Sequence, residues 1–257
     1  MRFIDTHAHL YSNPIQEQLL GVLKNALDNG IDTILMPAID SSTLEAMLAV
    51  ELAYPKNCIS MMGLHPCSVK ENVAEELTVV EQQLQKRKFI AIGEIGLDFY
   101  WDKTFTTQQQ FAFTQQMQWA LNYSLPIVIH TRNAMGETIE AVKPFAKKGL
   151  RGIFHCFSGS KESAEQIIAM GFHLGLGGVL TYKNAGVAEA IAAIPMEWLV
   201  LETDAPYLAP VPYRGKTNEP AFMIQVAMKL AEIKNIPLHE VAEITTKNAE
   251  RVFGIGK

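Results

Sequence analysis

Short apolar runs that favour β-strands recur along the whole chain, and this recurrence restricts the possible folds more than any other feature. There are eight such runs, and segments with helical spacing separate each from the next. A strand, a helix and a further strand form the unit of a parallel sheet, because a parallel connection has to cross back over the sheet. The runs are RFIDTHAH (2–9), DTILMPA (32–38), CISMMGLHP (58–66), FIAIGEIGLD (89–98), PIVIHTR (126–132), GIFHCFSG (152–159), HLGLGGVL (173–180) and WLVLETDAP (198–206).

The number of units and the chain length together favour one architecture. Eight strand–helix units in 257 residues match the size of a closed (β/α)8 barrel, or TIM barrel, which takes about 250 residues. A doubly wound open sheet is the structural alternative, but no GxGxxG sequence follows the first strand. No linker or low-complexity tract divides the chain. We therefore expect residues 1–257 to form a single α/β domain.

Helix boundaries are marked along the chain as this fold requires. The sequences Ser42-x-x-Glu45 and Thr106-x-x-Gln109 predict capping boxes at two helix starts. Glycines stand where helices are expected to end. These glycines are Gly30, Gly149 and Gly171.

Composition limits the classes of protein to consider. The chain is 48% hydrophobic and 19% charged, so it can bury a substantial core and does not resemble a disordered protein. A net charge of −5 gives no overall attraction for a polyanion, so nucleic acid would have to be bound locally or through metal. The cysteines are odd in number and form no CxxC pair, which is typical of reduced thiols. With no signal peptide and no membrane-spanning run, the sequence predicts a cytoplasmic protein without a membrane partner.

The segment FIDTHAHLY (3–11) carries polar groups at alternating positions. Successive side chains of a strand point to opposite faces, so Asp5, His7 and His9 share one face. Two imidazoles on one face can hold a metal ion, but for this segment alone a hydrogen-bonded or exposed pair is the commoner explanation. The rest of the chain has to distinguish these readings.

Titratable residues also stand at the ends of most other predicted strands. A (β/α)8 barrel brings the carboxyl ends of all its strands around one mouth, where the chemistry of this fold takes place. Unpaired polar groups are costly to bury there, whereas metal ligands are satisfied. His173 and His239 lie outside this set and are expected to be structural or exposed. The strand-end residues are His7, His9, His65, Glu94, His130, His155 and Asp204.

An ordered set of motifs runs along nearly the whole chain. The motifs are DTHAHL (5–10), GLHP (63–66), AIGEIGLDFYW (91–101), IHTRNA (129–134), FHCFSGS (154–160), TYKNA (181–185) and LETDAPYLAPVPYRGKTNEP (201–220). This set resembles that of the TatD-type metal-dependent deoxyribonucleases of the amidohydrolase superfamily. Two departures are mild: Asn133 stands where an acidic residue often follows the arginine, and Thr217 replaces the residue common before NEP.

The resemblance implies a site for two divalent metal ions. His7, His9 and Asp204 would bind one ion, His130 and His155 the other, and Glu94 would bridge them. The bridging role suits Glu94 because the fourth strand offers this carboxylate and no lysine. Asp204 is also the candidate for handling the proton of the attacking water. Asp5 and Glu202 are candidates for orienting ligands, although each could equally be a buried partner of a neighbouring strand.

Two further residues at the mouth are candidates for substrate binding. His65 and Arg132 would contact a phosphate, for which arginine offers paired donors. The alternatives are a salt bridge to a loop carboxylate for Arg132, and a helix cap or loop hydrogen bond for His65. The loop 205–220 could border the substrate groove or brace the C-terminal helices. The aromatic run 99–101 could stack on a base or pack on the barrel.

The function that the resemblance implies is hydrolysis of phosphodiester bonds in DNA, with removal of nucleotides from a 3′ end. The expected cofactors are two divalent ions: histidine favours zinc or manganese, and carboxylates permit magnesium. The expected partner is DNA, as 3′ ends or single strands, and nothing in the sequence requires a protein partner. The rival functions are an amide or ester hydrolase, including one that deacylates aminoacyl-tRNA, and a metal-binding scaffold without turnover.

Overall fold

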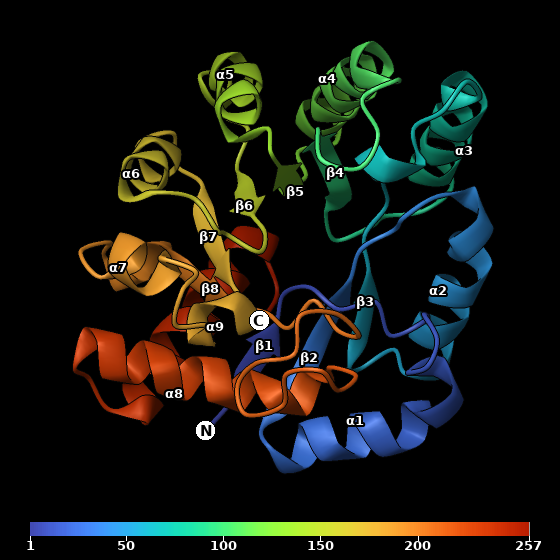
Figure 1. The fold of residues 1–257 in the computed structure, drawn as a ribbon. Helices are drawn as coiled ribbons and strands as arrows, with labels where there is room; N and C mark the ends of the chain where they lie inside the picture. The colour runs from blue at the N-terminus through green and yellow to red at the C-terminus, as the bar shows by residue number, and fades with distance from the viewer. Residues whose placement is uncertain (257) are drawn as a thin grey trace.

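The computed structural model describes residues 1–256 and contains the eight predicted strands in the predicted order (Figure 1). Each strand overlaps one of the eight apolar runs, and at least half of its residues are buried. The strands are β1 (Phe3–Asp5), β2 (Ile31–Met36), β3 (Cys58–Ser60), β4 (Ile92–Asp98), β5 (Ile127–Arg132), β6 (Gly152–Phe154), β7 (His173–Leu176) and β8 (Leu199–Leu201).

All the strand pairs are parallel, as the sequence predicted. The strands form two hydrogen-bonded groups, β1–β2–β3 and β4–β5–β6–β7–β8. Isolated parallel bridges join the groups at both seams, between Met62 and Ile92 and between Ala8 and Ala205. Because the first and last strands are neighbours, the sheet is not open, and the prediction of a (β/α)8 barrel is confirmed. Figure 1 shows the strands in the middle with the helices around them.

Helices follow the strands along the chain. Within residues 1–256, no helix combines the length and the hydropathy needed to cross a membrane. The α-helices are α1 (Leu19–Asp28), α2 (Ser41–Ala53), α3 (Val73–Lys86), α4 (Thr106–Tyr123), α5 (Met135–Ala146), α6 (Lys161–Ala169), α7 (Val187–Ile191), α8 (Met223–Lys234) and α9 (Leu238–Phe253). Short 3-10 helices are η1 (Gln16–Gln18), η2 (Pro66–Ser68), η3 (Gly178–Thr181), η4 (Met196–Trp198) and η5 (Pro220–Phe222).

The predicted helix ends are correct, but both predicted capping boxes are wrong. Gly30, Gly149 and Gly171 follow α1, α5 and α6 with positive φ angles of 82°, 93° and 84°. The start of α2 is capped by Asp40 rather than Ser42, because Asp40 accepts a hydrogen bond from the Ser42 amide.

The predicted box at the start of α4 fails for a different reason. Gln109 is buried and does not reach back to the helix start. Its side chain exchanges two hydrogen bonds with the backbone of Asp98, at 2.9 and 3.1 Å. This glutamine therefore fixes the end of β4 against α4.

The barrel interior is filled at one end and polar at the other. An apolar cluster contains Val128, Ile153 and Val200 from three strands, together with Phe253 of α9. Two residues further along β5, and likewise after β6 and β8, the same inward face carries His130, His155 and Glu202. Helix α9 closes the N-terminal end behind this cluster, so the polar residues are at the C-terminal mouth.

Candidate metal centre

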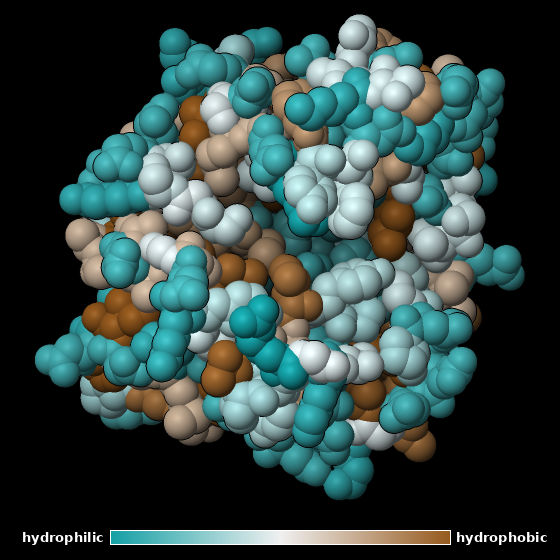
Figure 2. Space-filling view, in the orientation of Figure 1, coloured by the Kyte–Doolittle hydropathy of each residue, from teal (hydrophilic) through white to brown (hydrophobic). Residues whose placement is uncertain are grey.

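All the predicted metal ligands come together at the C-terminal mouth of the barrel. Figure 2 shows hydrophilic atoms at the bottom of a hollow in the middle of this face. Glu94 lies on β4 and His130 on β5, while the others lie one to four residues past the ends of β1, β6 and β8. The neighbouring groups that could hold a cation are His7–His9–Glu94, His7–His155–Asp204 and Glu94–His130–His155.

The carboxylate of Glu94 lies between two groups of imidazoles. Its Oε2 is 3.1 Å from Nε2 of His7 and 3.7 Å from Nε2 of His9. Its Oε1 is 2.9 Å from Nδ1 of His130 and 3.0 Å from Nε2 of His155. The two oxygens of one carboxylate therefore face different pairs of histidines, which is the geometry of a group shared by two cation sites.

Asp204 lies on the side of His7 and His9. Its Oδ1 is 3.6 Å from Nε2 of His7 and 3.5 Å from Nε2 of His9. The backbone of Asp204 has a φ of 58°, and its amide donates to the carbonyl of His7 at 2.8 Å. This bond ties the segment after β8 to the segment after β1, which places the carboxylate beside both imidazoles.

Three of the four imidazoles are held by an acceptor on the nitrogen that points away from the centre. Tyr11 donates its hydroxyl to the carbonyl of Pro37, so it accepts from Nδ1–H of His9, 3.0 Å away. Glu202 Oε1 faces Nδ1 of His155 at 3.2 Å, and Asp98 Oδ2 faces Nε2 of His130 at 2.9 Å.

These contacts leave nitrogen lone pairs directed at carboxylate oxygens. Once one nitrogen of a neutral imidazole donates outward, the other is an acceptor. The inward nitrogens of His9, His130 and His155 would then meet the lone pairs of Glu94 or Asp204, which is repulsive unless positive charge lies between them.

Burial lowers the pKa of His155, but the charges of Glu94 and Glu202 outweigh it and raise this pKa well above its ordinary value. A bound metal ion would take the place of such a proton, because imidazoles bind metal in their neutral form. Buried imidazoles oriented by outer acceptors, with carboxylates opposite, are thus a donor set that fits divalent metal ions.

The acids at the centre are ionised. Burial raises the pKa of Glu94, but the surrounding histidines outweigh it and hold this pKa well below its ordinary value. Burial likewise raises the pKa of Asp204, while the contact with His9 and the charges of His155 and His7 bring it below its ordinary value. Both side chains therefore present negative charge to a cation at neutral pH.

The two candidates for orienting ligands lie in different places. Glu202 contacts His155 as described, and its carboxylate occupies the space that a side chain at Gly175 would need. Asp5 contacts no imidazole: it accepts from the amide of His7 and from the amide and hydroxyl of Thr203. Complete burial raises the pKa of Asp5 to about 8, although these bonds lower it in part. Asp5 thus joins β1 to the segment after β8.

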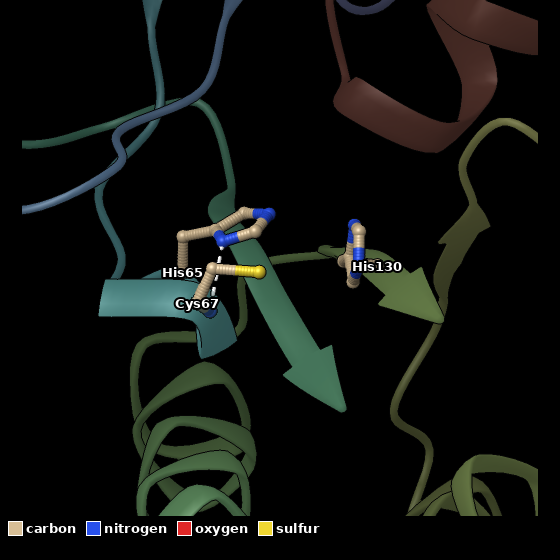
Figure 3. A group of neighbouring side chains, drawn as sticks. All are labelled: His65, Cys67 and His130. Carbon is tan, nitrogen blue, oxygen red and sulfur yellow. Dashed lines mark hydrogen bonds between the residues drawn. The ribbon is translucent and has the colours of Figure 1, made fainter. Parts of the chain in front are cut away.

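His65 forms the helix cap that was considered as its alternative role, and its other ring nitrogen faces the centre. Its Nδ1 accepts from the amide of Cys67 at 3.0 Å and caps η2, as Figure 3 shows. Its Nε2 is 3.4 Å from Oε1 of Glu94, so the ring also reaches the centre. Cys67 and His130 lie beside it and complete a further group of possible cation ligands. The helix cap fixes the orientation in which His65 faces the mouth.

Arg132 lies at the rim and does not form the salt bridge considered as its alternative. Its guanidinium carbon is 3.9 Å from the ring centre of Tyr100 and 5.1 Å from that of Trp101. Within residues 1–256 it pairs with no carboxylate. Tyr100 and Trp101 are 51% and 68% exposed, so they present open aromatic faces at the mouth. Stacking holds the guanidinium in place and leaves its N–H donors free.

Two residues with clear contacts at the centre, Asp98 and Tyr11, were not predicted, although the sequence contained a signal for each. Glu94 and Asp98 are four residues apart on β4, so strand alternation places both on the inner face. Tyr11 continues the alternation of His7 and His9 by one more step.

His173 and His239 lie away from the centre, as expected: His173 is buried at the start of β7, and His239 is exposed on α9.

The fold and the site together define a metal-dependent hydrolase built on a (β/α)8 barrel. The sequence model of one family, described as TatD related DNase, matches residues 4–254. The chain belongs to this family, as its motifs predicted.

Relatives of known sequence cover the chain almost completely. It is 37% identical over 253 residues to YabD of Bacillus subtilis, with 98% of each chain covered. It is 30% identical over 268 residues to YcfH of Escherichia coli, with 99% of this chain and 97% of the relative covered. Both relatives are named uncharacterized metal-dependent hydrolases.

Solved structures agree with the fold. YjjV, a TatD homologue of Escherichia coli, superposes with a TM-score of 0.94 at 30% identity over 99% of both chains. A mutant organophosphorus hydrolase of Deinococcus radiodurans has a TM-score of 0.65 at 12% identity, covering 98% of this chain and 93% of that one. The second likeness concerns the barrel alone.

Proposed function

We propose that this protein is a deoxyribonuclease that removes nucleotides from 3′ ends of single-stranded DNA, with two divalent metal ions at the mouth of the barrel. One observation carries the proposal: the oxygens of Glu94 face different pairs of imidazoles, and three of those imidazoles are oriented from behind. Membership in the TatD related DNase family supports DNA as the substrate.

The ligands divide between two ions around Glu94. His7, His9 and Asp204 would hold one ion, His130 and His155 the other, with Glu94 shared. When bound, a pair of divalent ions polarises a phosphodiester, lowers the pKa of water and stabilises the leaving oxygen. The protein fixes the positions of these ligands through Tyr11, Asp98 and Glu202, whose bonds to the outer nitrogens set the tautomer of each ring.

Two residues would act directly on the substrate. Arg132 binds a phosphate oxygen through its free N–H groups, and His65, whose ring lies 4.5 Å from that of His130 on the same side of the mouth, binds a second one. Asp204 accepts the proton of the attacking water, because its carboxylate is ionised and its side chain is 14% exposed, unlike that of Glu94 at 3%. It is thus the acid of the centre that water can reach.

The test is an assay with a 3′-labelled oligonucleotide, with and without chelator. We expect labelled nucleoside monophosphate to be released, the chelator to abolish the release, and added manganese, magnesium or zinc to restore it. Glu94→Gln, purified in the same way, is the control for a contaminating nuclease.

Product analysis separates the rival functions. An aminoacyl-tRNA deacylase would release an amino acid and leave the nucleic acid intact. An amide or ester hydrolase would turn over small substrates and leave DNA unchanged. Intact DNA at every metal tested would refute the nuclease.

A further inference from the structure

A further hollow lies on the mouth side of the barrel, between the segments that follow β7 and β8. It has a volume of about 470 Å³ and is lined by the segment 181–185 after β7 and by Val211 and Arg214 from the loop after β8. Both segments leave the carboxyl ends of their strands. In Figure 1 the loop between β8 and α8, drawn in orange, crosses the near face of the barrel.

The walls of this pocket are fixed to each other. The hydroxyl of Tyr182 donates to the carbonyl of Ala209 at 2.9 Å, and the amide of Val211 donates to the hydroxyl of Thr181 at 2.9 Å. Gly178 permits this contact, because a Cβ there would lie 1.9 Å from the carbonyl oxygen of Leu208. The pocket is therefore built before any ligand arrives.

Its charged groups are available to a ligand. The guanidinium carbon of Arg214 lies 4.2 Å from the ring centre of Tyr182, and Lys183 is exposed next to it. In the described part of the chain, neither cation pairs with a carboxylate. In a protein with a net charge of −5, two unpaired cations at one pocket are a local site for an anion.

The same loop reaches the metal centre at its other end. The ring of Tyr207 lies 5.9 Å from that of His9, and Tyr207 is 51% exposed. This loop therefore carries an exposed aromatic residue at the metal centre and Arg214 at the pocket. A flat guanidinium held on an aromatic ring offers a face for a base as well as donors for a phosphate.

We propose that this pocket holds a nucleotide of the bound DNA strand on the 5′ side of the one that is removed, with Lys183 and Arg214 on its phosphate. The inference rests on the proposed function. If the enzyme removes nucleotides from a 3′ end, that end lies at the metal centre and the rest of the strand extends from it in the 5′ direction. The pocket then determines how strongly the enzyme prefers a longer strand to a dinucleotide.

The experiment compares kcat/KM for a single-stranded oligonucleotide with kcat/KM for a dinucleotide that carries no 5′ phosphate and therefore lacks the phosphate that Lys183 and Arg214 would hold. Lys183→Ala and Arg214→Ala should each lower the oligonucleotide-to-dinucleotide ratio about three- to tenfold, through KM, because each removes one phosphate contact. The slope of log affinity against log salt should become shallower by about 0.7 for each variant. Arg151→Ala, just before β6 at the opposite end of the barrel, is the matched control and should leave the ratio unchanged.

The outcomes separate this inference from the proposed function. If the wild type cleaves the oligonucleotide but both variants keep its ratio and its salt slope, the pocket does not bind the strand. If the wild type cleaves no DNA at all, the proposed function and the pocket fail together. Thermal melting of each variant excludes misfolding as the cause of a changed ratio, and Arg214→Lys, which keeps the charge, should restore part of the loss.

Discussion

Asp98 and His130 lie side by side at the ends of neighbouring strands, with Oδ2 of the acid 2.9 Å from Nε2 of the ring. The other ring nitrogen is 2.9 Å from Glu94. Burial raises the pKa of Asp98, but its bonds to His130 and to the amides of Trp101 and Tyr100 outweigh this and keep the pKa below its ordinary value. Asp98 therefore remains an anion that fixes which nitrogen of His130 faces the centre.

The substitution Asp98→Asn should weaken binding at the site that contains His130. Asparagine keeps an acceptor for the loop amides but removes the charge that orients the ring, and losing such an outer partner typically costs about 10- to 100-fold in metal affinity. A competitive titration against a metal indicator measures the change. Asp102→Asn, which affects an acid paired with Lys70 instead of a histidine, is the control and should bind metal like the wild type.

Metal content should respond differently to Glu94 and to His155. Glu94→Ala removes the carboxylate proposed to touch both ions, so both should be depleted from up to two per chain. His155→Ala removes a ligand of one ion and should deplete mainly that one. Metal analysis by mass spectrometry after identical purification distinguishes the two patterns. If Glu94→Ala retained as much metal as the wild type, the bridging assignment would be wrong.

The parts of the site that the sequence revealed are those set by strand position. His7, Glu94, His130 and Asp204 were predictable because a barrel forces the carboxyl ends of its strands together. This argument needs only the order of the strands and the alternation of faces, both of which are local properties of the sequence.

What the sequence left open depends on contacts between distant segments. Asp5 and Glu202 had the same two interpretations, yet Glu202 contacts His155 while Asp5 bonds to Thr203. The distinction depends on which strands are neighbours and on the space that Gly175 leaves beside Glu202. The capping error at Gln109 has the same origin, because a long-range bond to Asp98 displaces the local one.

His173 makes stability depend on pH at the end of the barrel opposite the site. Burial, followed by the nearby charge of Arg251, lowers the pKa of His173 from 6.5 to about 4. Between these values the unfolded chain binds a proton that the folded chain does not, so the free energy of unfolding falls as the pH drops from about 6.5 to 4. The loss reaches roughly 3 kcal/mol below pH 4.

Urea unfolding of the wild type and of His173→Asn at several pH values tests this effect. Other groups titrate equally in both proteins, so the difference between their free energies isolates His173. That difference should move in favour of the variant as the pH falls from about 6.5 to 4. A difference that stayed constant over this range would show that His173 is protonated alike in the folded and unfolded chains.

Arg132 provides the sharpest distinction between a nuclease and its rivals. Arg132→Ala should leave the metal content intact, since the guanidinium lies on Tyr100 and Trp101 and contacts no proposed ligand. Loss of a charge-assisted hydrogen bond to a phosphate costs roughly 1.5–3 kcal/mol, so kcat/KM for DNA should fall about tenfold to a hundredfold. Turnover of a small ester or amide, which carries no phosphate, should change little. Arg87→Ala is the control, because Arg87 also lies over an aromatic ring, that of Phe89, and stands before β4, away from the mouth. Arg87 pairs with Glu51 as well, so thermal melting of this variant shows whether loss of that ion pair affects the fold. Equal loss of DNA cleavage in both variants would mean that the loss comes from removing one positive charge anywhere on the protein, and not from a contact at the mouth. Cleavage of DNA by Arg132→Ala at the wild-type rate would show that Arg132 does not bind a phosphate.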